Sequence, residues 1–113
     1  MDNKAISKEW FAFAKRDLES AKFLINMNPK PLEIICYHCE QSAEKYLKGY
    51  IILNENKSER THDLIVLNNK CKAIDASFET IEDDCIELVP YGVQVKHQYM
   101  SLSILMKIEL KKE

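Results

Sequence analysis

The fold of this chain is decided by residues 37–48, which read Tyr37-His38-Cys39-Glu40-Gln41-Ser42-Ala43-Glu44-Lys45-Tyr46-Leu47-Lys48. An α-helix turns once every 3.6 residues, so this spacing separates a polar face from an apolar face. The polar face carries Tyr37, Gln41, Glu44 and Lys48, and the opposite face carries Ile35, Cys39, Ala43, Tyr46, Leu47 and Tyr50. We expect one face of this helix to pack against the core. The other face should present a row of amide, carboxylate and ammonium groups to water or to a partner.

Length and composition predict one globular domain over residues 1–113. The chain has 113 residues, of which 46% are hydrophobic and 30% are charged, as in ordinary globular proteins. It has no uncharged apolar run long enough to cross a membrane, and no signal-peptide pattern follows Met1. Four cysteines in such a chain fit reduced, buried thiols better than disulfides. We therefore expect a cytoplasmic protein.

The charge balance argues against nucleic acid as a partner. Sixteen Lys and Arg residues against eighteen Asp and Glu residues give a net charge of −2. The longest basic run is Lys111-Lys112, whereas binding through phosphate neutralisation needs a basic patch. The sequence leaves open whether the fold gathers a local patch.

Proline and glycine divide the chain into helical pieces. Two glycines and three prolines supply too little turn chemistry for an all-β domain. The pattern predicts an all-α fold, an antiparallel up-and-down bundle of four to five helices. The first expected helix runs from an N-cap at Ser7 to about Ile25, and the second covers 32–53 with Pro31 in its first turn. A short third helix is capped by Thr61 or Asp63, and a fourth runs from Asp75 or Ser77 to Pro90. An irregular or extended segment over 91–97 and a last amphipathic helix over about 102–110 complete the chain.

Residues 37–48 resemble the second-helix signature of HEPN domains (higher eukaryotes and prokaryotes nucleotide-binding), an aromatic-His-x-x-Gln-x-Ala-Glu-Lys-x-Leu-Lys pattern. Further features that are similar to the family follow in the family's order. They are Trp10 with Ala14 and Asp17-Leu18, then Thr61-His62-Asp63-Leu64, then Tyr91 through Lys96 in the place of a Tyr-x-x-x-x-Arg-Tyr-Pro segment. The chain departs from the family where Lys96-His97-Gln98 replaces Arg-Tyr-Pro.

The resemblance implies a small helical bundle that usually forms a homodimer. Similar proteins are often encoded beside a minimal nucleotidyltransferase, in toxin–antitoxin or related systems. We expect a binding or regulatory module without a cofactor, whose groove beside the second helix receives a nucleotide-like ligand or a partner protein. The residues expected to bind the ligand or partner are Tyr37, His38, Gln41, Glu44, Lys45, Lys48, His62, Asp63, Tyr91 and Lys96.

The polar row of the second helix has two other interpretations. Gln41 and Tyr37 would meet their counterparts across a two-fold axis if the row is a subunit interface. Alternatively, Glu44 and Lys48 form an ordinary exposed pair at i and i+4, which contributes only a few tenths of a kcal/mol. The sequence alone does not choose among the three.

A ribonuclease toxin with non-standard active-site residues is the alternative function. The ribonuclease motif of some HEPN proteins is Arg-x(4–6)-His, in which arginine holds phosphate and histidine moves protons. The chain has only Arg16 and Arg60, and neither has a histidine five to seven positions later. We therefore expect no catalytic residues. We also expect no metal, because Cys36 and Cys39 fall on the apolar side of a helix, where thiols pack as small hydrophobes.

Overall fold

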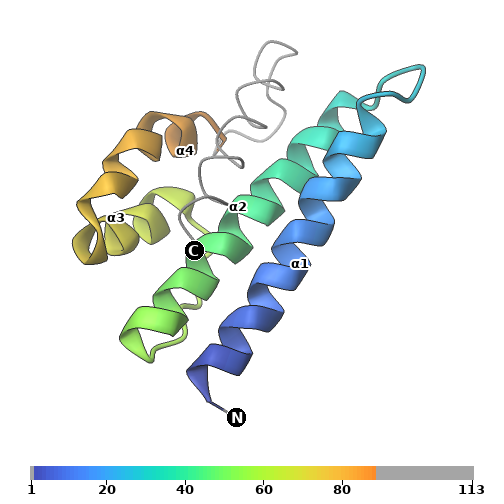
Figure 1. The fold of residues 1–113 in the computed structure, drawn as a ribbon. Helices are drawn as coiled ribbons and strands as arrows, with labels where there is room; N and C mark the ends of the chain where they lie inside the picture. The colour runs from blue at the N-terminus through green and yellow to red at the C-terminus, as the bar shows by residue number, and fades with distance from the viewer. Residues whose placement is uncertain (1, 89–113) are drawn as a thin grey trace.

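The computed structural model describes residues 2–88, in which four α-helices and one 3₁₀-helix follow one another (Figure 1). Every regular element in this range is helical, which confirms the predicted all-α class. Tyr91, Lys96, the segment 91–97 and the expected last helix lie outside the described residues. The elements are α1 (Asn3–Leu24), α2 (Leu32–Glu55), α3 (Leu64–Ile74), η1 (Ala76–Ile81) and α4 (Glu82–Leu88).

Helix α1 begins four residues before the predicted cap. Asp2 is its N-cap, and the Asp2 carboxylate accepts a hydrogen bond of 2.7 Å from the backbone N–H of Ala5. Ser7 lies inside the helix, where its hydroxyl donates to the carbonyl of Lys4. The prediction of Ser7 as cap was wrong because the first turn carries too few core side chains to show apolar periodicity.

Helix α2 covers the predicted range and two further residues. Pro31 stands at its N-cap position instead of in its first turn. At the other end Asn56 adopts a left-handed conformation with φ 55° and donates its N–H to the carbonyl of Ile52. Asparagine tolerates this conformation better than most residues, so Asn56 stops the helix.

The short elements start at the predicted caps. The Asp63 carboxylate accepts hydrogen bonds from the N–H groups of Ile65 and Val66, and it is the N-cap of α3. Asp75 does the same for η1 by accepting from Ser77. The predicted fourth helix therefore begins as a 3₁₀ segment and continues as α4.

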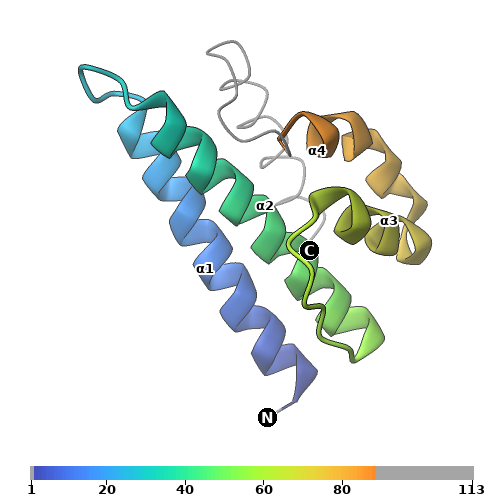
Figure 2. The same cartoon turned by 180° about the vertical axis from the view of Figure 1, so that it is seen from behind.

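Helices α1 and α2 form an antiparallel hairpin, and α3, η1 and α4 cover the other side of α2 (Figures 1 and 2). The apolar face predicted for α2 is confirmed, although Tyr50 is only partly buried. None of the helices over residues 2–88 is long and apolar enough to span a bilayer. The core consists of Ala14, Leu18 and Ala21 of α1, Ile35, Cys39, Ala43, Tyr46, Leu47 and Ile51 of α2, and Leu64, Leu67, Cys71, Phe78, Ile81 and Cys85 of the later elements.

Small residues let α1 and α2 approach closely and so fix which side chains meet. A Cβ atom on Gly49 would stand 2.7 Å from a ring carbon of Phe11 and 3.1 Å from Cβ of Trp10. The fully buried Ser42 hydroxyl donates a 2.6 Å hydrogen bond to the carbonyl of Ala14. This register sets the polar contacts between the two helices.

Candidate functional site

The polar residues of α2 are divided between two clusters. We call Asp17, His38 and Lys45 the Asp17 cluster, and Glu44, Lys48 and His62 the Glu44 cluster. Each consists of one carboxylate, one lysine and one histidine. Their environments differ, and this difference decides what each can do.

In the Asp17 cluster, a histidine and a lysine of α2 meet one carboxylate of α1. Nδ1 of His38 lies 3.0 Å from Oδ1 of Asp17, and Nζ of Lys45 donates to Oδ2 at 2.5 Å. His38 and Lys45 are seven residues apart, which is two helical turns, so they lie on one face of α2. Both side chains keep 26% of their surface exposed.

Two aromatic rings and the side chain of Arg16 lie near the Asp17 cluster. The Phe13 ring lies 5.4 Å from Cζ of Arg16 and 6.0 Å from Nζ of Lys45, both within the range of cation–π attraction. The Tyr37 ring meets His38 edge-on, with 5.7 Å between the ring centroids. Phe13 and Tyr37 are both exposed. The fold therefore gathers basic and aromatic groups on one surface of an acidic chain.

The Glu44 cluster is buried. Oε2 of Glu44 lies 3.0 Å from Nζ of Lys48 and 2.8 Å from Nδ1 of His62, so both partners share one oxygen. The side chains of Glu44 and Lys48 are only 7% and 5% exposed, whereas that of His62 is 81% exposed. His62 thus covers the carboxylate from outside while its own ring faces solvent.

The expectation that Glu44 and Lys48 face water was wrong. The Trp10 ring of α1 lies 5.7 Å from the Lys48 ammonium, and the loop before α3 brings His62 onto Glu44. These groups come from other parts of the chain, and they bury an i, i+4 pair that an isolated helix would expose. Burial and the nearby Glu44 charge, in that order, also raise the pKa of Glu40.

The remaining predicted site residues take separate positions. Gln41 is half-buried on α2, between His38 and Glu44 in sequence, and Asp63 serves as the N-cap of α3. In the structure His62 contacts Glu44, which also pairs with Lys48, whereas His38 and Lys45 both contact Asp17. Sequence reasoning missed Phe13, Arg16 and Asp17 as neighbours of these groups. The available signal was Asp17, which stands in the first-helix pattern quoted above.

The cysteines are packed thiols. All four are free and buried, as expected for Cys36 and Cys39 from their position on the apolar face. Burial is the main cause that raises the pKa of Cys39 and of Cys71 to about 12. Such thiols stay protonated at neutral pH and do not act as nucleophiles. Over residues 2–88 no three His, Cys, Asp or Glu side chains are grouped so that they could hold a metal ion.

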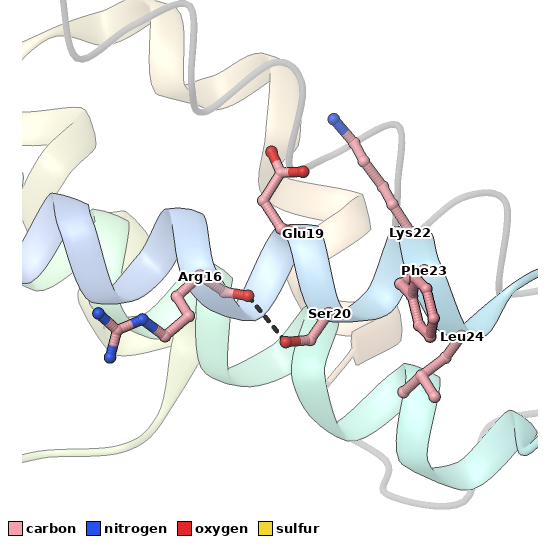
Figure 3. Close-up of a pocket in the computed structure, with 6 residues that line it drawn as sticks. All are labelled: Arg16, Glu19, Ser20, Lys22, Phe23 and Leu24. Atoms are coloured by element: carbon pink, nitrogen blue, oxygen red, sulfur yellow. Dashed lines mark hydrogen bonds between the residues drawn. The ribbon is translucent and has the colours of Figure 1, made fainter.

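Two surface hollows lie along α1. One, of about 340 Å³, is lined by Glu9, Trp10 and Phe13, so it includes the rings that contact Lys48 and Lys45. The other, of about 710 Å³, includes Arg16 and Phe23 among the α1 residues that Figure 3 shows. Both hollows place exposed aromatic rings beside charged side chains on the outer surface of α1.

The hairpin of α1 and α2, covered on one side by short helices and carrying a basic and aromatic surface, defines a small all-helical bundle domain. The model of the HEPN domain family matches residues 7–102, so this chain belongs to the HEPN domain family. Membership supports a nucleotide-binding or ribonuclease-type module in general. Comparison with curated proteins and with solved structures gave no match.

Proposed function

We propose that this domain is a homodimeric binding module that works with a minimal nucleotidyltransferase and binds a nucleotide-like ligand beside α2. The observation that carries the proposal is the outer surface of the α1–α2 hairpin. There, exposed aromatic rings lie next to partly exposed cations.

Exposed apolar side chains on the hairpin support the dimer. Large apolar side chains that are exposed in a free subunit become buried when they lie in a subunit interface. Phe23 is the strongest case, since 79% of its surface is exposed although it is a large apolar residue. HEPN domains commonly form dimers, in agreement with this surface. Besides the rings of Phe13 and Tyr37, the exposed large apolar residues of the hairpin are Phe23, Met27, Ile34 and Leu53.

The Asp17 cluster supports the ligand. Its lysine and histidine are reachable from solvent, and Arg16 adds a further positive charge beside them. Phosphate groups bind to such cations, and bases stack on exposed rings such as Phe13 and Tyr37. Lys48 is buried against Glu44, so we assign it no contact with the ligand.

Family membership alone supports the nucleotidyltransferase partner and a role in a toxin–antitoxin-like system, and fold-level analogy is a weak warrant for function. A gene for such an enzyme beside the gene for this chain, with co-purification of the two products, would support this part. We place the complex in the cytoplasm, where its four free thiols remain reduced.

Light scattering of the purified protein tests the dimer. The parent chain should be a dimer at micromolar concentration, and Phe23→Lys should be a monomer because it introduces a charge into the apolar surface. Val66→Lys is the matched control, since Val66 is also exposed but belongs to α3. A monomeric parent, or equal effects of the two lysines, would count against an interface on the hairpin.

Two histidine–carboxylate pairs favour ribonuclease activity as the second candidate. His38 with Asp17 and His62 with Glu44 have the contact that orients an imidazole for proton transfer. Purified protein that degrades RNA in the presence of a chelator, and loses this activity on His62→Ala or His38→Ala, would replace the binding module with an enzyme. We expect no degradation, because neither pair has an arginine in the spacing of the family's motif.

A further inference from the structure

We propose that Asp17 is a built-in competitor of the anionic ligand, so that phosphate must displace or share its carboxylate to reach His38 and Lys45. The inference rests on the proposed function, because it concerns the same ligand surface. It adds a regulatory contact that belongs to the free protein.

Both carboxylate oxygens of Asp17 are engaged, one by His38 and one by Lys45. Oδ1 lies 3.0 Å from Nδ1 of His38, and Oδ2 accepts from Nζ of Lys45 at 2.5 Å. Phosphate oxygens that bind the same two side chains would make the same kind of contacts. In the free domain, Asp17 therefore takes the place that the anionic ligand would occupy.

The hairpin does not depend on this ion pair alone. His38 and Lys45 are 26% exposed and Asp17 is 14% exposed, so solvent reduces the contribution of the pair below that of a fully buried one. The α1–α2 contact is also fixed by the buried hydrogen bond from Ser42 to Ala14 and by apolar packing of Leu18 and Ala21. A contact that is one of several between the two helices, and that occupies both the accessible lysine and the accessible histidine, fits a role in binding.

The cluster can still accept an anion in the presence of Asp17. Arg16 and Lys45 contribute two positive charges against the single negative charge of Asp17, and His38 adds a third when protonated. Within residues 2–88, the Lys45 ammonium has Asp17 as its one hydrogen-bond acceptor and so keeps donors for a ligand. The surface hollow lined by Glu9, Trp10 and Phe13 is linked to Lys45 by the Phe13 ring, so a ligand there lies nearer to Glu9 than one held at Asp17. Asp17 thus weakens anion binding without preventing it.

The strength of the competition follows from Coulomb's law. A negative charge about 6 Å from a bound phosphate, at an effective dielectric constant between about 20 and 80, weakens binding by roughly threefold to a hundredfold. Removal of the charge should therefore tighten binding by about tenfold, and most strongly at low salt.

Isothermal titration calorimetry of the full chain with ATP, inorganic triphosphate and adenosine tests the inference. Asp17→Asn should bind ATP and triphosphate about tenfold more tightly than the parent and should leave adenosine unchanged. Asp83→Asn is the matched control, because it removes the same charge from an exposed position on α4 and should change nothing. Asp17→Ser removes the charge with a different side chain and should show the same gain. Thermal unfolding checks that each variant is folded.

The outcomes separate this inference from the proposed function. ATP binding that needs Lys45, tested with Lys45→Met, but does not tighten on Asp17→Asn would overturn the competitor and leave the ligand site standing. Weaker binding by Asp17→Asn would also overturn it and give Asp17 a positioning role. If neither the parent nor Asp17→Asn binds ATP or triphosphate, both proposals fail. If Asp17→Asn tightens the binding of triphosphate and of ATP by the same factor, Asp17 competes with the phosphates alone. If ATP also binds more tightly than triphosphate to both proteins, the base makes a contact of its own.

Discussion

The Asp17 cluster and the Glu44 cluster contain the same three kinds of side chain, yet the lysine and carboxylate are more exposed in the first than in the second. The lysine of the Asp17 cluster keeps 26% of its side chain exposed, whereas the lysine of the Glu44 cluster keeps 5%. Lys45 and Lys48 are three residues apart on one helix, so their position on α2 does not explain the difference. The covering groups do, because Trp10 and His62 enclose Lys48 and Glu44.

This difference assigns the two clusters different roles. A buried charge that loses its partner is strongly destabilising, because nothing replaces its lost hydration. Lys45 is partly solvated with or without its partner, so the Asp17 ion pair should add less to stability than the buried Glu44 ion pair. We infer that the Glu44 cluster holds the hairpin to the loop before α3, and that the Asp17 cluster is free to exchange its internal contact for a ligand.

The largest expected effect comes from Lys48→Met. Methionine preserves much of the length and apolar packing of the lysine side chain. It leaves the buried Glu44 carboxylate with His62 as its one remaining side-chain partner within residues 2–88. We expect a loss of about 3–5 kcal/mol in the free energy of unfolding. Urea unfolding followed by circular dichroism measures it.

Lys45→Met is the matched control in the Asp17 cluster. It removes the same charge from the same helix, but the partner Asp17 is 14% exposed against 7% for Glu44. We therefore expect a smaller loss, between the value of about 1 kcal/mol for an exposed pair and that of about 3–5 kcal/mol for a buried pair. Similar losses for the two variants would remove the distinction between the clusters.

The sequence predicted the parts of this arrangement that depend on neighbouring residues. The 3.6-residue period found α2 and its buried face, including Ile35, Ala43 and Leu47. Capping chemistry found the start of α3, because the Asp63 carboxylate reaches N–H groups two and three residues away. Both signals are contained within a few turns of helix, so no tertiary knowledge was needed.

The burial of Glu44 and Lys48 depends on groups far away in the chain and therefore escaped the sequence. Trp10 reaches Lys48 only because Gly49 lets α1 lie close to α2. The partners of His38 and Lys45 escaped for the same reason, since the register of the two helices decides that Asp17 faces them. A helical period separates polar from apolar faces, but it does not show which polar face another element will cover.

Gly49→Ala tests whether this close approach maintains the Glu44 cluster. The new methyl group would stand 2.7 Å from the Phe11 ring, and overpacking of this kind costs about 1–3 kcal/mol. Alanine recovers about 0.8–1 kcal/mol of helix propensity, so we expect a net loss of at most about 2 kcal/mol. Chemical denaturation gives the value, and the Trp10 fluorescence of the folded protein should change as α1 shifts. A net gain in stability would show that the ring of Phe11 moves aside without strain.

Asp63→Ala tests the element that carries His62. It removes the acceptor of two backbone N–H groups at the start of α3, which should cost about 1 kcal/mol. Asp63→Asn should lose much less, because asparagine is an equally good cap. If Asp63 contacted a ligand through its charge instead, Asp63→Asn would keep stability and lose binding.

The smallest effect concerns Glu40, whose raised pKa reflects the buried surroundings and the charge of Glu44 one turn away. A carboxyl with a higher pKa in the folded state than in the unfolded state binds more protons when folded, so it lowers stability as the pH rises through that interval. Glu40→Gln should therefore raise the thermal midpoint at neutral pH. The gain should disappear as the pH falls below the ordinary glutamate pKa of about 4.3.

Glu79→Gln serves as the comparison for Glu40, because Glu79 is exposed on η1 and lies outside both clusters. It should give no gain that depends on pH in this way. A gain for Glu40→Gln that persisted unchanged into acid would mean that the stabilisation comes from packing or helix propensity. In that case neither burial nor the negative charge of Glu44 would raise the pKa of Glu40.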